Sequence, residues 1–346
     1  MKKLTSVICI CVLFLTLAGC NAKPQPIVST PVNAKDFRIT VYISCDNAAL
    51  TENLDSSHFD ILTDIIMIGN ADYNEQGEII LKESFDKNLS DIRQYMKKEQ
   101  RLYLNIILPM PENDETEWEK QMAVLADANT KAFKSGKLET EIKDTLEKYG
   151  FDGVFFDYEF PLRKKDWKAF DKFIVSLDKV LGDDYLIGMS MVGWNLQQSK
   201  EAMEATDLFT VMSYDIWDEN GYHASTQMAE DDIEKFINAG YDKAKLDMGV
   251  PFYARPTTHD AYWYSYKDYY KKLSEDGLYT DKGETDLVFS FNTYDMIYDK
   301  TQWALENGVG GMMVWHYACD VSADNKKSLF NAMEKAKSEA VEKETN

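Results

Sequence analysis

Histidine is scarce in this chain, and its distribution removes one class of function. The 346 residues contain four histidines, His58, His223, His259 and His316. They are scattered and lack the paired histidine and cysteine spacings that hold metal ions in proteins. The sequence therefore predicts no metal site.

Positive charge is in short supply as well. Lysine and arginine number 38 against 59 aspartate and glutamate residues, which gives a formal net charge of −21 at pH 7. A surface this acidic repels phosphate backbones and anionic lipid head groups. We therefore expect neither nucleic acid nor an anionic membrane surface as a partner.

An apolar run at the start of the chain is too short to cross a bilayer. It extends over residues 4–17, follows two lysines and ends in Leu17-Ala18-Gly19-Cys20. This pattern predicts a secretory signal over residues 1–20. Its last four residues resemble a bacterial lipoprotein box, which implies cleavage before Cys20 and a lipid on that cysteine. Cleavage as an ordinary signal peptide is the alternative.

Three regions follow the signal. Residues 21–35 contain three prolines and no apolar periodicity, which predicts a flexible tether. Residues 36–336 carry the apolar and aromatic content of a folded domain, and the polar residues 337–346 predict a frayed tail. We expect an exported monomer that is anchored to a bacterial membrane through its lipid alone.

Few cysteines remain once the signal is removed. Cys45 and Cys319 follow the first and last strands predicted below, and they would be neighbours in a closed barrel. A disulfide between them suits an exported protein. Two buried thiols are an equally good interpretation.

Apolar strand patterns alternate with amphipathic helix patterns along the folded region. Eight strands are predicted, at residues 37–44, 61–69, 102–108, 151–159, 185–192, 208–214, 246–253 and 309–315. Helices are predicted between most of them, including 138–149, 167–181, 231–239 and 294–306, and a last helix is predicted at 326–335. This order favours a (β/α)8 TIM barrel over an open doubly wound sheet. No glycine-rich phosphate loop follows the first strand, which further disfavours a dinucleotide-binding fold.

The fourth predicted strand places two carboxylates two residues apart. Side chains alternate along a strand, so Phe155, Asp157 and Glu159 share one face. The Cα atoms of the two acids would lie about 6.5 Å apart. Burying two ionised carboxylates this close is costly, so one keeps its proton to higher pH, and the pair supplies an acid and an anion. Acidic surface residues at a strand end are the alternative interpretation.

Other strand ends carry aromatic residues. Active sites of such barrels lie at the carboxyl ends of the strands. Met212 and Tyr214 end the sixth predicted strand, Tyr253 and Arg255 end or follow the seventh, and Trp315 ends the eighth. Aromatic side chains with few cations at one mouth suit a cleft for sugar rings. Core packing is the alternative for any single one of them.

Four motifs at these strand ends resemble those of one known family. The family pattern D-G-x-D-x-D-x-E is matched at Asp152, Gly153, Asp157 and Glu159. The patterns M-[ST]-Y-D, G-x-P-F-Y-x-R and G-x-G-G-x-x-x-W are matched at residues 212–215, 249–255 and 308–315. With these motifs in this order, the chain resembles the family 18 glycoside hydrolases, which include chitinases and endo-β-N-acetylglucosaminidases.

The resemblance implies retaining hydrolysis of β-1,4 linkages that follow N-acetylglucosamine, in which the N-acetyl group of the substrate is the nucleophile. Glu159 would protonate the leaving oxygen and later activate water, Asp157 would orient the acetamido group, and Tyr214 would hydrogen-bond its carbonyl. No cofactor is implied. Substrate contacts are expected from Tyr42, Met212, Asp215, Tyr253, Arg255 and Trp315.

Chitin-type oligosaccharides and the chitobiose core of N-glycans are the substrates that the resemblance implies. A peptidoglycan-directed glucosaminidase and a non-catalytic, lectin-like lipoprotein on the same barrel are the alternatives. Such non-catalytic relatives typically lose the acid, so the intact Glu159 favours the enzyme.

The chain departs from the family pattern in three places. Phe155 stands where the family has an inner aspartate, so we expect Asp157, without that partner, to point up toward Glu159 or the substrate. The third strand continues from Asn105 without the usual S-x-G-G, which predicts a different cleft wall. The segment 256–308 is too short for the large domain that many family members insert there, so we expect a single domain with a more open cleft.

Overall fold

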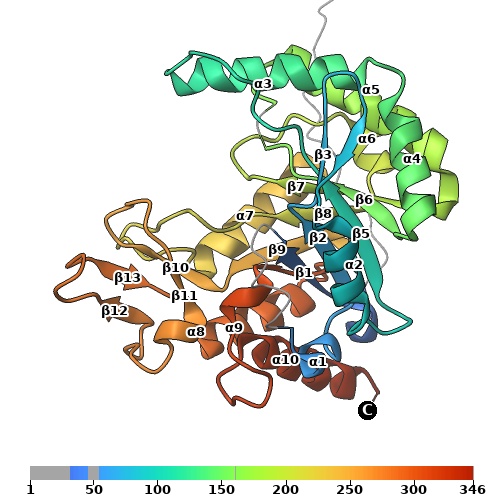
Figure 1. Cartoon of the computed structure of the whole chain (residues 1–346). Coiled ribbons are helices and arrows are strands. Elements are labelled where there is room, and N and C mark those ends of the chain that lie inside the picture. Colours follow the sequence, from blue (N-terminus) through green and yellow to red (C-terminus); the bar gives the residue numbers. More distant parts are fainter. Residues whose placement is uncertain (1–31, 46–53, 160, 346) are drawn as a thin grey trace, which may run out of the picture.

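The computed structural model describes residues 32–45, 54–159 and 161–345. The predicted signal, Cys20 and residues 21–31 of the predicted tether lie outside these ranges. In the described residues, a closed barrel of parallel strands is surrounded by helices (Figure 1).

The barrel confirms the predicted fold class. Its strands, in the order in which they neighbour one another, are β1 (Arg38–Ser44), β14 (Gly311–Trp315), β9 (Leu246–Pro251), β8 (Leu208–Val211), β7 (Leu186–Met191), β6 (Gly153–Phe156), β5 (Arg101–Ile106) and β2 (Asp64–Ile68). Each lies within or overlaps one of the eight predicted strands. The parallel pairing of β1 with β14 closes the sheet.

Helices cover the outside of this barrel. The α-helices are α1 (Ser56–Phe59), α2 (Phe85–Arg93), α3 (Trp118–Phe133), α4 (Leu138–Tyr149), α5 (Lys164–Leu181), α6 (Lys200–Ala205), α7 (Thr226–Ala239), α8 (Tyr266–Tyr269), α9 (Tyr294–Glu306) and α10 (Leu329–Thr345). Short 3-10 helices are η1 (Ala34–Asp36), η3 (Gly182–Asp184), η4 (Lys243–Lys245) and η5 (Tyr317–Cys319). The predicted bounds of α4 and α9 agree with the structure, whereas α5 and α7 begin earlier than predicted. No helix of the described residues is long and apolar enough to cross a membrane.

The last helix corrects one prediction. α10 continues to Thr345, so the polar tail predicted at 337–346 is helical over nearly its whole length. Lys337 Nζ donates to the Phe37 carbonyl at 2.6 Å, and the Glu344 carboxylate accepts the Ala34 N–H at 3.0 Å. These contacts tie the helix to the segment before β1. Polar composition alone gives no sign of them.

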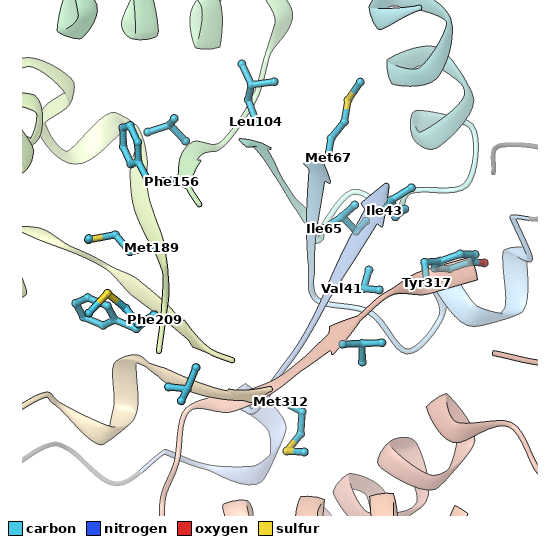
Figure 2. Packing of buried hydrophobic residues seen from close by; sticks show 14 of the residues in the cluster. Val41, Ile43, Ile65, Met67, Leu104, Phe156, Met189, Phe209, Met312 and Tyr317 are labelled. Atoms are coloured by element: carbon cyan, nitrogen blue, oxygen red, sulfur yellow. The ribbon is translucent and has the colours of Figure 1, made fainter. Parts of the chain in front are cut away.

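The main hydrophobic core lies between the barrel and its helices. Figure 2 shows Val41 and Ile43 of β1 and Ile65 and Met67 of β2 pointing away from the barrel axis. All four side chains are fully buried. Because helices cover this outer face and other strands cover the inner face, the strand sequences are continuous apolar runs.

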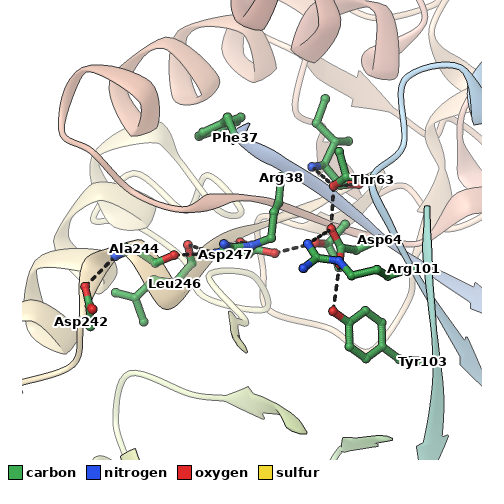
Figure 3. Close-up of polar contacts among 12 residues, drawn as sticks. Phe37, Arg38, Thr63, Asp64, Arg101, Tyr103, Asp242, Ala244, Leu246 and Asp247 are labelled. Carbon is green, nitrogen blue, oxygen red and sulfur yellow. Dashed lines mark hydrogen bonds and ion pairs between the residues drawn. The ribbon is translucent and has the colours of Figure 1, made fainter. Parts of the chain in front are cut away.

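The amino end of the barrel is closed by a polar layer (Figure 3). Arg38 Nε donates to Asp247 Oδ1 at 2.9 Å, and Arg101 Nε lies 2.7 Å from Asp64 Oδ1. The Tyr103 hydroxyl donates to Asp64 at 2.9 Å. Each buried carboxylate thus has an arginine partner, which satisfies its charge. This layer stabilises the end of the barrel opposite the predicted active site.

Phe155 fills the middle of the barrel. Its side chain is fully buried and lies in one inner cluster with Tyr42, Tyr103 and Met313. A Cβ on Gly188 would lie only 2.0 Å from the Phe155 ring, so the glycine provides the space for that ring. Phe155 therefore acts as a core residue at the position where the family pattern has an acid.

A small sheet follows β9 instead of a large inserted domain. Its antiparallel strands are β11 (Tyr264–Ser265), β10 (Tyr253–Pro256), β13 (Val288–Ser290) and β12 (Leu278–Thr280). A two-stranded ribbon, β3 (Ala71–Tyr73) and β4 (Ile79–Leu81), follows β2. Cys45 and Cys319 are both buried and are not joined by a disulfide, so the structure favours the two-thiol interpretation.

Candidate active site

The two carboxylates of the fourth predicted strand lie just beyond its observed end. β6 ends at Phe156, and Asp157 and Glu159 follow at the carboxyl end of the barrel. Both line a cavity of about 700 Å³. The other predicted residues that line this cavity are Met212, Tyr214, Asp215, Tyr253, Arg255 and Trp315. Residues far apart in the sequence therefore meet at one mouth, as the barrel geometry requires.

Asp157 is hydrogen-bonded to Ser190 of β7. β6 and β7 pair through Phe155↔Gly188 and Phe156↔Met189, which places Ser190 beside Asp157. The prediction that Asp157, without an inner aspartate, points up toward Glu159 or the substrate stays a prediction. The residue lines the cavity, and its carboxylate also bonds to the buried hydroxyl of Ser190. Its Oδ1 atom is buried and accepts no hydrogen bond from the described residues.

A row of hydroxyl groups supports Asp157 from below. The Tyr42 hydroxyl lies 2.6 Å from Ser190 Oγ and 3.1 Å from Thr210 Oγ1. Burial, and then the nearby Asp157 charge, raises the pKa of Tyr42, so this hydroxyl keeps its proton. When Ser190 donates its hydrogen to Asp157, the Tyr42 hydroxyl donates to Ser190 and the Thr210 hydroxyl donates to Tyr42. All three hydroxyl groups are then oriented toward the carboxylate.

Tyr42 does not occupy the position expected of a substrate contact. Its side chain is 1% exposed and is absent from the cavity lining. Its ring lies 5.3 Å from that of Trp315 between centroids. Tyr42 therefore lies beneath the floor of the cavity, where it packs against Trp315 and orients Ser190.

Glu159 has the electrostatic surroundings of a general acid. Burial raises its pKa to about 7, and the charges of Asp157 and Asp215 contribute in the same direction. Burial also raises the pKa of Asp157, to about 6, against the opposing hydrogen bond with Ser190. The carbonyl of Glu159 accepts a 3.4 Å hydrogen bond from Asn195 Nδ2. Both pKa values are raised, so the pair holds a proton close to neutral pH, and the Asp215 charge beside Glu159 favours that carboxyl as its site.

Asp215 is held in its ionised form. Arg255 binds both its oxygens, with Nε at 2.7 Å from Oδ1 and Nη2 at 2.9 Å from Oδ2. The Tyr253 hydroxyl donates to Oδ1 at 2.6 Å. Burial tends to raise the pKa of Asp215, but the hydrogen bonds from Arg255 and Tyr253 outweigh it and hold the pKa well below its usual range. A paired, ionised carboxylate of this kind can bind sugar hydroxyls but cannot donate a proton.

Tyr214 and Trp315 complete the centre of the cavity. Burial raises the pKa of Tyr214 well above its usual value, so its hydroxyl remains a hydrogen-bond donor. The Tyr214 ring packs edge-on against Tyr253 with centroids 6.2 Å apart. Trp315 is partly exposed at the end of β14 and offers an apolar surface to a sugar ring.

Sequence reasoning missed several residues of this site. Ser190 and His223 contact the acids, and Trp194 and Trp263 line the cavity with exposed fractions of 59% and 50%. The aromatic run around Trp263 was the one available signal, because large exposed aromatics often bind ligands. Ser190 and His223 carried none, since their contacts depend on strand register and on a loop.

Comparison with known proteins places this geometry in a family. Residues 38–320 match glycosyl hydrolases family 18, and the chain belongs to that family. A curated relative, "Probable chitinase 2" of Drosophila melanogaster, is 29% identical over 141 residues, which is 35% of this chain and 29% of that protein. "Chitinase 1" of Aphanocladium album is 23% identical over 236 residues, which is 53% of this chain and 54% of that protein. The chain thus spans about half or less of the curated relatives it matches.

Solved structures share the fold at low sequence identity. The family 18 chitinase ChiB from the chitin utilization locus of Flavobacterium johnsoniae has a TM-score of 0.68 at 20% identity, covering 88% of this chain and 94% of that one. The chitinase-like agglutinin RobpsCRA from Robinia pseudoacacia has a TM-score of 0.66 at 17% identity, covering 86% and 98%. These likenesses establish the barrel architecture.

Proposed function

We propose that this chain hydrolyses β-1,4 linkages that follow N-acetylglucosamine in chitin-type oligosaccharides. The observation that carries the proposal is the buried carboxyl of Glu159, whose pKa of about 7 lets it hold a proton near neutrality. The same cavity holds Asp157 and Tyr214. An acid with its pKa near the working pH is an efficient general acid, and it becomes a general base after it has donated its proton.

The first step breaks the glycosidic bond. Glu159 donates its proton to the leaving oxygen while the acetamido carbonyl oxygen of the sugar attacks the anomeric carbon. The Asp157 carboxylate, which lines the cavity, accepts the acetamido N–H. The Tyr214 hydroxyl donates to the acetamido oxygen and holds it in line for attack. The product of this step is a cyclic oxazolinium ion, whose positive charge the Asp157 carboxylate stabilises.

The second step restores the sugar. Glu159, now ionised, takes a proton from water as its oxygen attacks the anomeric carbon on the face that the leaving group vacated. The bond between that carbon and the acetamido oxygen breaks, and its electron pair restores the neutral acetamido group. Two inversions at that carbon give net retention of configuration. Trp315 supports the sugar from below, and the Asp215–Arg255 pair binds its hydroxyls.

The charge of the cavity favours neutral chitin-type sugars over peptidoglycan. Five acidic residues line the cavity, Asp157, Glu159, Asp215, Asp231 and Asp232, against the cations Lys235 and Arg255. The lactyl groups of peptidoglycan carry peptide stems with free carboxylates, which an acidic lining repels. A non-catalytic lectin on the same barrel is the second candidate, because a chitinase-like agglutinin shares the fold. The acid Glu159 and its partners in one cavity favour the enzyme.

A substrate panel tests the proposal. Purified full-length protein and its Glu159→Gln variant are incubated with chitooligosaccharides, a high-mannose glycoprotein and peptidoglycan, and the products are identified by mass spectrometry. We expect the parent protein to shorten the chitooligosaccharides and the variant to leave them intact. Binding of the sugars without cleavage by the parent would establish the lectin instead, and cleavage of peptidoglycan alone would contradict the charge argument.

We also propose that the protein is exported and anchored by a lipid on Cys20, a residue outside the described ranges. The proposal rests on the signal pattern and the sequence Leu17-Ala18-Gly19-Cys20. Metabolic labelling with a radioactive fatty acid in a bacterial host should label the parent and not the Cys20→Ala variant. Equal labelling of both would exclude this site of attachment.

A further inference from the structure

The loop between β8 and α7 carries Asp215 at one end and Ala224 at the other. Both residues have a positive φ, 54° for Asp215 and 49° for Ala224. This backbone conformation is uncommon for residues with a Cβ and persists where surrounding contacts impose it. The contacts that hold this loop therefore also determine where the Asp215 carboxylate lies.

His223 connects the two ends of the loop. Its ring is buried, and its Nε2 atom accepts the backbone N–H of Asp215 at 2.9 Å. The same nitrogen lies 3.4 Å from Asp215 Oδ1. Because Nε2 accepts a hydrogen bond from the backbone, this nitrogen carries no proton and the ring is neutral, and burial also lowers the pKa of His223. A displacement of His223 would thus remove a direct support of Asp215.

Two side chains outside the loop hold His223 and Ala224 in place. Lys300 of α9 donates from Nζ to the Ala224 carbonyl at 2.7 Å and to Asn292 Oδ1. Asn292, just before α9, directs its Nδ2 atom to the Ala224 carbonyl at 3.3 Å and the His223 carbonyl at 3.4 Å. Apart from the hydrogen bond between Lys300 and Asn292, these contacts end on the carbonyls of His223 and Ala224.

Lys300 is an unusual residue to bury. Its side chain has no exposed surface, and burial lowers its pKa to about 7, with Glu230 as the charge that opposes this. An amine donates hydrogen bonds in either protonation state, so the hydrogen bond from Lys300 to the Ala224 carbonyl persists at pH values below and above that pKa. An apolar side chain would fill this position at a lower desolvation cost but would leave the Ala224 carbonyl without this donor.

We propose that Lys300 and Asn292 are positioning residues for the reaction. They fix the backbone of His223 and Ala224 from α9, and His223 in turn holds Asp215 against Arg255 and within range of Glu159. Neither residue lines the cavity, so both act through the loop. This inference rests on the proposed function, because it assigns the loop a role in that reaction.

Loosening the loop has a specific consequence for Glu159. The ionisable groups that face Glu159 are Asp157, Asp215, Tyr42 and Tyr214. Of these, Asp215 is the one that the loop carries. If Asp215 moves away, less negative charge faces Glu159, and the pKa of Glu159 falls. The basic limb of the pH profile then moves to lower pH. Misplacement by about 1 Å lowers kcat/KM by about 10- to 100-fold.

The variants Lys300→Met and Asn292→Ala test this inference in the full-length protein. Lys245→Met is the matched control, because Lys245 also donates to two backbone carbonyls, of Glu204 and Thr206, just before β8 at the opposite end of the barrel. Thermal unfolding confirms folding, and kcat/KM for a fluorogenic chitobioside is measured from pH 4 to 9. We expect both test variants to lose about 10-fold or more and to shift the basic limb downward, with no limb shift in the control.

Two outcomes would overturn the inference. The first is that the test variants keep the basic limb of the parent's pH profile and a kcat/KM within twofold of the parent. If Lys300→Met fails to fold, the result for Asn292→Ala alone decides. The second applies if the parent cleaves no substrate, in which case the proposed function fails and crystal structures decide. In those crystal structures, we expect the φ angle of Asp215 to be no longer positive in Asn292→Ala and to stay positive in Lys245→Met. A φ angle of Asp215 that is unchanged in both variants would contradict the inference.

Discussion

The pH profile of the parent protein and of Asp157→Asn tests how the two carboxylates interact. The productive state has Asp157 ionised and Glu159 protonated. Burial places their pKa values at about 6 and about 7. We therefore predict a bell-shaped kcat/KM profile with its maximum between these values. Above it, activity falls about tenfold for each unit of pH, since a group with a pKa of 7 is about one tenth protonated at pH 8.

Replacing Asp157 by asparagine removes a negative charge that raises the pKa of Glu159. Two unit charges about 5 to 8 Å apart interact by about 2 to 3 kcal/mol at an effective dielectric constant of about 20, which corresponds to about 1.5 to 2.5 pKa units. Because Asp157 is partly protonated at the relevant pH, we expect the basic limb to move down by about one unit. The acidic limb disappears, since no carboxylate remains at position 157 to ionise. Overall activity falls as well, because Asp157 stabilises the intermediate.

The assay uses a fluorogenic chitobioside at constant ionic strength, because salt screens charge interactions. Asp152→Asn is the control: Asp152 accepts the Leu102 N–H at 2.7 Å at the amino end of β6, and it does not line the cavity. Its profile should have both limbs of the parent. A basic limb near pH 7 in Asp157→Asn would contradict this prediction, since the group that titrates there would then be insensitive to the charge of Asp157.

Other predictions concern stability and the supporting residues. Gly188→Ala should lower the free energy of unfolding in urea by about 1 to 3 kcal/mol, because the new Cβ meets the Phe155 ring, and Phe155→Leu in the same chain should restore part of the loss; no recovery would contradict this packing. Asp247→Ala should cost about 3 kcal/mol of stability by leaving Arg38 without its partner, while kcat/KM of the folded protein stays within twofold of the parent. Ser190→Ala should move the acidic limb of the pH profile to higher pH, because the hydrogen bond that favours ionised Asp157 is lost; an unchanged limb would show that this bond does not act on catalysis.

The fold was predictable because each barrel strand is buried on both faces. Such strands leave long apolar runs in the sequence, and their alternation with amphipathic helices admits few architectures. Closure then follows from the number of strands, and it brings Asp157, Tyr214 and Trp315 to one mouth although they are far apart in the chain. This part of the candidate site required only the rule that active sites lie at the carboxyl ends of the strands.

The remaining parts depend on three-dimensional detail. Alternation gives the face on which Tyr42 lies but not its depth, so the sequence did not show that it lies below the cavity floor. The Asp157–Ser190 contact depends on the register of β6 against β7, and the space for Phe155 depends on Gly188 of the neighbouring strand. The polar end of α10 is helical because Lys337 and Glu344 contact the segment before β1. None of these pairings leaves a periodic signal.

The anomeric configuration of the first product shows whether the acetamido group of the substrate attacks first. We propose that it does, with Glu159 as the acid and Asp157 as the supporting anion. Chitooligosaccharide hydrolysis is followed by proton NMR from the first minutes, before the product anomers equilibrate. We predict that the β-anomer forms first and that Glu159→Gln forms no product. An α-anomer formed first would show direct attack by water and would contradict the proposal.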